Sequence, residues 1–153
     1  MAHCKFSLDI DLVDKTILPQ PFRMPVQLVN RPNSDFRGIS GKVASGYISK
    51  NDEISIFPSG KKTRVKEIIS PNGSVDKSLP GQSITLTFKD EIDCSRGNII
   101  SSAKLPLEIS DQFDATIIWM DEKPFVPGRS YNLKIGCLEL QATCSQPKYK
   151  INT

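Results

Sequence analysis

The sequence has almost none of the side chains on which most catalytic sites depend. Its 153 residues include one histidine, His3, so neither a Ser-His-Asp nor a Cys-His arrangement has a credible general base. The four cysteines form no CxxC pair, and only His3 could join them as a zinc ligand. These shortages predict a chain with no catalytic residue and no metal site of its own.

A phosphate-binding loop of the GxxxxGK[ST] type is also missing. In that loop backbone N–H groups hold the phosphates, while the lysine and the hydroxyl serve the γ-phosphate and Mg²⁺. Gly41-Lys42 is followed by Val43, and Gly60-Lys61 by Lys62, so neither pair supplies the hydroxyl. We therefore expect turn or strand glycines at these positions, and no nucleotide cofactor bound by this chain.

Long apolar runs are absent as well. No stretch approaches the length of about 20 residues that spans a bilayer, and no basic segment followed by an apolar one opens the chain as a secretion signal would. The irregularly spaced cysteines are therefore expected to be reduced thiols. We expect a cytoplasmic protein without a membrane partner.

The charge excess is small. Lysine and arginine number 20 against 17 acidic residues, and the pI near 8.7 is below the value of about 9 at which nucleic-acid binding becomes the default expectation. The basic cluster at 61–66 is interpreted as a solvated turn rather than a phosphate-binding patch. Aromatic residues make up 7%, so core packing is favoured for Trp119 over base stacking. Nucleic acid is not an expected partner.

Strand patterns are what the sequence does contain. Phe22, Met24, Val26 and Leu28 lie at alternate positions, and this run stops at 30–33, which reads Asn-Arg-Pro-Asn. Further strands are predicted where turn residues separate short apolar runs, at 38–48, 53–57, 63–69, 84–88 and 98–102. Six short strands without a helical period predict an all-β fold, either a closed antiparallel barrel or a sandwich.

The predicted organisation has three parts. Residues 1–19 are an N-terminal linker or an added segment, and 20–104 form the six-stranded barrel. Residues 105–153 carry a second group of strands, predicted at 113–120, 130–135, 138–143 and near 149–151. Because four strands rarely close a barrel, this last part is expected to be a partial second barrel with open edges.

Several strings resemble a known family of domains. Gly38–Ile48, Pro80–Ile84 and Ser95–Asn98 resemble the second domain of translational GTPases of the elongation factor Tu type. In that family the domain is a six-stranded β-barrel, and the third domain is another barrel. Gly41 and Gly46 would serve the close strand approach and the bending at barrel corners.

A sharper resemblance involves the strings Phe22–Asn33, Asp35–Gly38, Asp90–Asp93 and Trp119-Met120. Together they look like the large, GTPase subunit of bacterial sulfate adenylyltransferase, the CysN/NodQ family. The matching strings span about residues 20 to 136. Each string is weak alone, and the combination is what is specific.

This resemblance implies a role within a larger enzyme. The complete subunit would hydrolyse GTP and drive its small catalytic subunit to make adenosine 5'-phosphosulfate and pyrophosphate from ATP and sulfate. GTP and Mg²⁺ would sit in a domain expected before Phe22, and the third domain is expected to continue past Thr153. No catalytic or GTP-binding residue carries over, so this chain is expected to be a non-catalytic packing and subunit-interaction module.

Arg31, Asn33, Asp35 and Arg37 are the candidate contact residues, because they cluster in one loop beside the matched strings. Their partner would be the GTP-binding domain of the same parent subunit or the small catalytic subunit. The alternative is that they only cap and close a turn.

Other functions stay open at this stage. A stand-alone translation-factor-like barrel would bind RNA or tRNA, and an excised or truncated domain fragment would have no activity of its own. Whatever the function, the incomplete second barrel leaves open strand edges at 113–120 and 138–143, which predict some self-association.

Overall fold

The computed structural model describes residues 20–33 and 36–149, and in this part of the chain the secondary structure is all β. The predicted segment 1–19 lies outside the described residues. No described segment is a helix long and apolar enough to cross a membrane. The strands are β1 (Arg23–Asn30), β2 (Gly38–Lys42), β3 (Ile48–Ser49), β4 (Glu53–Phe57), β5 (Lys61–Ser70), β6 (Gly73–Val75), β7 (Lys77–Ser78), β8 (Ser83–Phe88), β9 (Ile99–Ser102), β10 (Ser130–Ile135) and β11 (Leu138–Thr143).

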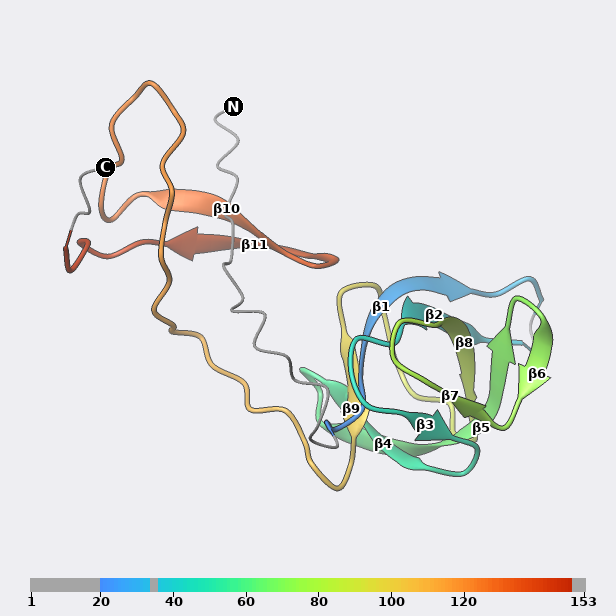
Figure 1. Cartoon of the computed structure of the whole chain (residues 1–153). Coiled ribbons are helices and arrows are strands. Elements are labelled where there is room, and N and C mark those ends of the chain that lie inside the picture. The colour runs from blue at the N-terminus through green and yellow to red at the C-terminus, as the bar shows by residue number, and fades with distance from the viewer. Residues whose placement is uncertain (1–19, 34–35, 150–153) are drawn as a thin grey trace. The chain divides into compact units, whose positions relative to one another are not determined.

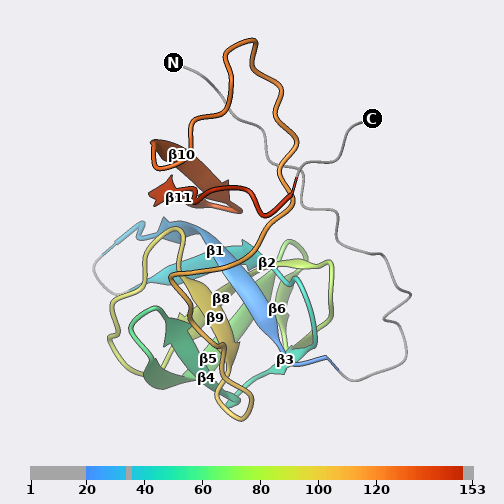
Figure 2. The same ribbon diagram turned by 90° about the vertical axis from the view of Figure 1, so that its left-hand side faces the viewer.

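The first nine strands belong to one compact unit that contains the described residues up to Ile109. Its main sheet has the order β4-β9-β1-β2-β8-β5-β6, and β4 also pairs with β5. This last pairing closes six strands into an antiparallel ring, which can be followed in Figures 1 and 2. The predicted fold class is therefore confirmed, and the barrel is the closed alternative rather than the sandwich.

The interior of the ring is filled by the apolar positions that the strand patterns predict. Met24 and Val26 of β1 and Leu86 of β8 are fully buried, and Phe88 is partly buried against the same cluster. Alternation places such side chains on the inner face of a strand and polar ones outside. The core consists of Phe22, Met24, Val26, Ile39, Val43, Ile48, Ile54, Ile56, Val65, Ile68, Ile84, Leu86, Cys94 and Ile100.

Leu28 departs from the alternation that the sequence predicts. The register between β1 and β2 shifts between Val26 and Leu28, where one extra residue interrupts the ladder. A bulge of this kind reverses which side chains face inward beyond it. Leu28 is therefore 58% exposed, while Val29 packs against the core instead.

The predicted strand 38–48 is two strands in the structure. After β2 the chain leaves the ladder, and the N–H of Ala44 donates to the carbonyl of Arg23 at 2.8 Å. Gly46 has a φ of 62°, and a Cβ there would lie 2.5 Å from the carbonyl oxygen of Gln20. This sharp bend against the start of β1 separates β2 from β3 and explains the glycine at that position.

The second unit contains Ser110–Ile135 and the described residues from Glu139 onward. Its regular structure is the two-stranded sheet of β10 and β11, so both outer edges of this sheet are unpaired among the described residues. The predicted strand at 113–120 is wrong, because that segment has no regular secondary structure and belongs to no sheet. The stretch predicted near 149–151 lies almost wholly outside the described residues.

Three aromatic side chains organise this second unit. Trp119 meets Phe125 and Tyr131 edge-on, with ring centroids 5.3 and 5.7 Å away, and Phe125 stacks on Tyr131. Trp119 Nε1 donates to the carbonyl of Lys123, and the Tyr131 hydroxyl lies 3.1 Å from the carbonyl oxygen of Val126. Trp119 is therefore partly buried and packs in this aromatic cluster, which lies outside the barrel core, so the predicted core position is not what the structure shows.

Candidate interaction surface

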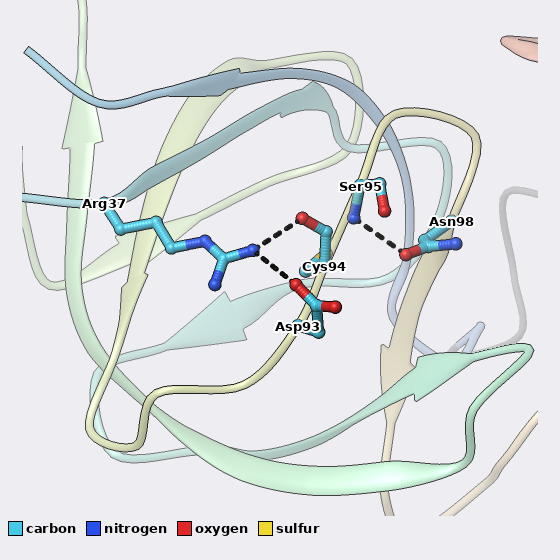
Figure 3. A network of polar contacts seen from close by, with 5 residues as sticks. All are labelled: Arg37, Asp93, Cys94, Ser95 and Asn98. Carbon is cyan, nitrogen blue, oxygen red and sulfur yellow. Dashed lines mark hydrogen bonds and ion pairs between the residues drawn. The ribbon is translucent and has the colours of Figure 1, made fainter.

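Arg37 lies just before β2 and reaches the connection between β8 and β9. Its Nη2 atom donates to the carbonyl oxygen of Cys94 at 2.9 Å and lies 3.3 Å from Oδ1 of Asp93 (Figure 3). The Arg37 side chain is 24% exposed, whereas the Asp93 side chain is 92% exposed. The bond to the Cys94 carbonyl is therefore the better protected of the two and fixes the guanidinium.

The connection that receives Arg37 is itself rigidly held. The N–H of Ser95 donates to Oδ1 of Asn98 at 2.8 Å, as Figure 3 shows, and the N–H of Asn98 donates back to the Ser95 carbonyl. Gly97 and Asn98 exchange hydrogen bonds of 3.0 and 2.9 Å with Val26 of β1. These bonds occur at the bulge, so the bulge and the loop conformation support each other.

Cys94 anchors the same loop from the inside. Its side chain is 2% exposed and belongs to the barrel core. Burial raises the pKa of the Cys94 thiol to about 11, the positive charge of Arg37 opposes that rise, and the charge of Asp93 adds to it. The thiol is therefore neutral at physiological pH and serves as a small apolar side chain.

A shallow surface hollow of about 420 Å³ lies over this loop. Arg31, Arg37 and Arg96 line it, and Asp93 is the one acidic residue of the lining. Leu28, which the bulge turns outward, also contributes to the lining. The hollow therefore combines an excess of positive charge with an exposed apolar side chain.

The structure separates the four residues that the sequence nominated. It brings Arg31 and Arg37 into the lining of one hollow. Oδ1 of Asn33 accepts a hydrogen bond of 2.9 Å from the N–H of Phe36, which is the turn-closing role that the alternative interpretation proposed. Asp35 lies outside the described residues. The contact role of these residues stays a prediction.

Sequence reasoning missed three further residues of the hollow. Arg96 and Asp93 lie within strings that carried the family resemblance, but on a connection about 60 residues away, so their approach to Arg31 was not visible. The alternating pattern of β1 places Leu28 on the same face of the strand as Val26. Only the bulge, for which the sequence gives no local signal, turns it outward.

A second basic surface lies on β5. Lys62, Arg64 and Lys66 are exposed, and they alternate with the buried Thr63 and Val65. These cations make no ion pair with other described residues. The whole basic cluster at 61–66 thus lies on a strand rather than in a turn, although its side chains are solvated as predicted.

Comparison with known proteins gives relatives but no matching family model. The chain is 45% identical over 140 residues to the bifunctional enzyme NodQ of Rhizobium sp. (strain N33), which is 92% of this chain and 22% of that protein. It is 52% identical over 115 residues to sulfate adenylyltransferase subunit 1 of Aliivibrio fischeri (strain MJ11), which is 75% of this chain and 24% of that protein. The bifunctional enzyme CysN/CysC of Rhodopirellula baltica is 44% identical over 134 residues, which is 87% of this chain and 21% of that protein. The chain thus spans about a quarter of the length of these relatives.

Solved structures support the same fold. Sup35 complexed with GMPPNP matches with a TM-score of 0.70 at 20% identity, covering 84% of this chain and 32% of that one. Translation elongation factor SelB from Methanococcus maripaludis, in complex with the GTP analogue GppNHp, matches with a TM-score of 0.70 at 20% identity, covering 93% and 30%. At this identity the likeness concerns the fold, which is that of translation-factor domains.

Proposed function

Because this chain is related over most of its length to one segment of the sulfate adenylyltransferase large-subunit family, which includes NodQ and CysN/CysC, we propose that it is the β-barrel interaction module of such a subunit. In this role the module packs against the GTP-binding domain of its own subunit and contacts the small catalytic subunit. The module supplies binding surface and rigidity, and the chemistry takes place elsewhere in the enzyme.

The observation that carries this proposal is the extent of the sequence match. An identity of 45% over 140 residues extends through the barrel and into the second unit. A match that long shows common descent with the relatives' segment rather than a shared fold alone. The hollow around Arg37 then gives the module a surface suited to protein contact, since arginine is enriched at interfaces and at their energetic hot spots.

The proposed activity of the whole enzyme is the formation of adenosine 5'-phosphosulfate and pyrophosphate from ATP and sulfate, driven by GTP hydrolysis. GTP and Mg²⁺ would be held by the GTP-binding domain, and no residue of this chain is assigned to either. A rigid barrel suits such an enzyme, because a closed ring can transmit a domain movement to a partner without deforming. The cellular location proposed is the cytoplasm.

The test is direct association with the small catalytic subunit of sulfate adenylyltransferase from the same organism. We expect isothermal titration calorimetry to detect a saturable complex with this chain. Arg31→Glu should weaken the complex about tenfold or more, because it replaces an attractive charge by a repulsive one. Lys62→Glu, a matched charge reversal on β5, should leave the affinity within about twofold.

Two results would contradict the proposal. Absence of any heat or co-elution with either the small subunit or the isolated GTP-binding domain would remove the interaction role. Saturable binding of a fluorescent GTP analogue to this chain alone would remove the non-catalytic role.

A second candidate function is a translation-factor-like barrel that binds RNA. The exposed Lys62, Arg64 and Lys66 on β5 favour it, because these cations alternate along one strand and make no ion pair with other described residues. Fluorescence anisotropy with a single-stranded RNA would then show binding that weakens steeply with salt and is lost in Lys62→Gln/Arg64→Gln. We favour the first function, since the close relatives are subunits of a sulfate-activating enzyme.

A further inference from the structure

Among the described residues, acidic side chains do not balance the positive charge of the hollow. Arg31 and Arg96 are exposed and make no ion pair within residues 20–33 and 36–149. Asp93, the single acidic residue of the lining, is already 3.3 Å from Arg37. Within the described part of the chain, two guanidinium groups therefore remain available for an external anion.

Arg37 is fixed in position before any partner arrives. Its Nη2 atom is held by the Cys94 carbonyl and by Asp93, so the guanidinium loses little freedom when its remaining Nη1 donors bind. Pre-organised donors of this kind lower the entropy cost of binding a carboxylate. The backbone of Arg96 is also fixed, because Arg96 lies within the hydrogen-bonded loop 95–98.

The chemistry beside these cations selects the type of anion. Leu28 is 58% exposed and lines the hollow, and no aromatic side chain is among the lining residues. A nucleic-acid strand would find neither a stacking platform nor a continuous cationic track there. An acidic side chain followed by an apolar one fits both the guanidinium groups and Leu28.

We propose that the hollow lined by Leu28, Arg31, Arg37 and Arg96 is the docking site for an acidic loop of a partner protein, with a carboxylate bound by the arginines and an apolar neighbour packed on Leu28. This deepens the proposed function, on which it rests, by naming the chemistry of the partner at that site. The carboxylate of Asp93, which lines the hollow, competes with the partner's carboxylate for Arg37.

The experiment uses the full ¹⁵N-labelled chain and two blocked peptides, acetyl-Gly-Asp-Leu-Gly-amide and its matched control with Asn in place of Asp. Nuclear magnetic resonance titration should give shifts at Leu28, Arg31, Arg37 and Arg96 with the acidic peptide at millimolar concentration. The neutral peptide should bind about fivefold more weakly or worse, because a hydrogen bond to a charged group is stronger than one to a neutral group. Equal binding of both peptides, or shifts centred on β5, would overturn the proposal.

Substitutions distinguish the loss of a contact in the hollow from a general loss of folded structure. Arg31→Gln and Arg96→Gln should each weaken the acidic peptide about threefold to tenfold, whereas Lys62→Gln should not change it. Asp93→Asn should strengthen binding, because it removes the competing charge. A loss of fold would weaken binding, so this opposite sign cannot come from structural damage, and weaker binding in a folded Asp93→Asn variant would contradict the proposal.

Two further titrations identify the class of ligand. Inorganic phosphate and a short single-stranded RNA should bind the hollow more weakly than the acidic peptide, and a stronger response to either would overturn the choice of partner. Because the peptide assay contains no enzyme subunit, its failure is distinct from failure of the association with the small catalytic subunit. The peptide could fail while that association holds, which would move the interface elsewhere on the chain.

Discussion

Arg37 and Cys94, which are 57 residues apart in the sequence, are joined by a 2.9 Å hydrogen bond from the guanidinium to the backbone carbonyl. The bond ties the connection before β2 to the connection between β8 and β9, and both connections contribute to the lining of the hollow beside β1. The Asp93 carboxylate beside it is almost fully exposed. The two contacts of Arg37 should therefore differ in their contribution to stability.

The first prediction compares these two contacts. Arg37→Ala should lower the free energy of unfolding by about 1 to 2 kcal/mol, because it leaves the Cys94 carbonyl without its donor. Asp93→Ala should change it by less than about 0.5 kcal/mol, as expected for an exposed ion pair. Urea unfolding followed by far-ultraviolet circular dichroism measures both. Equal losses would mean that the ion pair, not the carbonyl bond, holds the loop.

The second prediction concerns the bulge in β1. Val26→Ala should destabilise the barrel by about 2 kcal/mol, because Val26 is fully buried. Leu28→Ala should stay within about 0.5 kcal/mol, since this side chain is exposed. The same unfolding measurement applies. A large loss at Leu28 would indicate uninterrupted alternation and no bulge.

The third prediction compares two glycines. A Cβ on Gly41 would lie 2.3 Å from the carbonyl oxygen of Pro25, whereas one on Gly60 would meet nothing within 4 Å. Gly41→Ala should therefore cost about 3 kcal/mol or more, because backbone must move. Gly60 has a φ of 69°, so Gly60→Ala should cost about 1 kcal/mol through backbone strain alone. Thermal unfolding of the two variants should rank them in this order.

The fourth prediction concerns the pH dependence of Cys94. The folded-state pKa of this thiol is raised from 9.0 to about 11, so the folded protein holds the proton more tightly than the unfolded chain. Its contribution to stability is complete below pH 9 and is lost as the pH rises from 9 towards 11. Unfolding experiments over this range should show a steeper decline for the parent chain than for Cys94→Ala. Parallel curves would contradict the raised pKa.

The fifth prediction is self-association through the sheet of β10 and β11. Both outer edges of this sheet are unpaired among the described residues, and Leu140 on β11 is 38% exposed. Sedimentation velocity should show an average mass that rises with concentration, and Leu140→Lys should reduce the rise, because a charge on an edge strand opposes pairing. A strictly monomeric profile at high concentration would argue against it.

Local patterns in the sequence determined the barrel strands and much of the core. Short apolar runs between turn residues predict β4, β5, β8 and β9, because alternation and turn chemistry are properties of neighbouring residues. The family resemblance also rested on sequence alone, and the relatives confirmed it. The same patterns could not predict that segment 113–120 is not a strand, since a strand requires a partner that its own residues do not specify.

The tertiary structure decided which strands close the ring and which side chains form the hollow. The pairing of β4 with β5, the bulge at β1 and the approach of Arg37 to Cys94 all join residues that are distant in sequence or depend on a partner strand. The candidate contact residues in the loop before β2 therefore have different roles. Asn33 closes a turn, while Arg31 and Arg37 line a hollow together with Arg96. Sequence fixes what each side chain can bind, but only the folded chain brings those side chains together, because their approach depends on ladder register and loop closure.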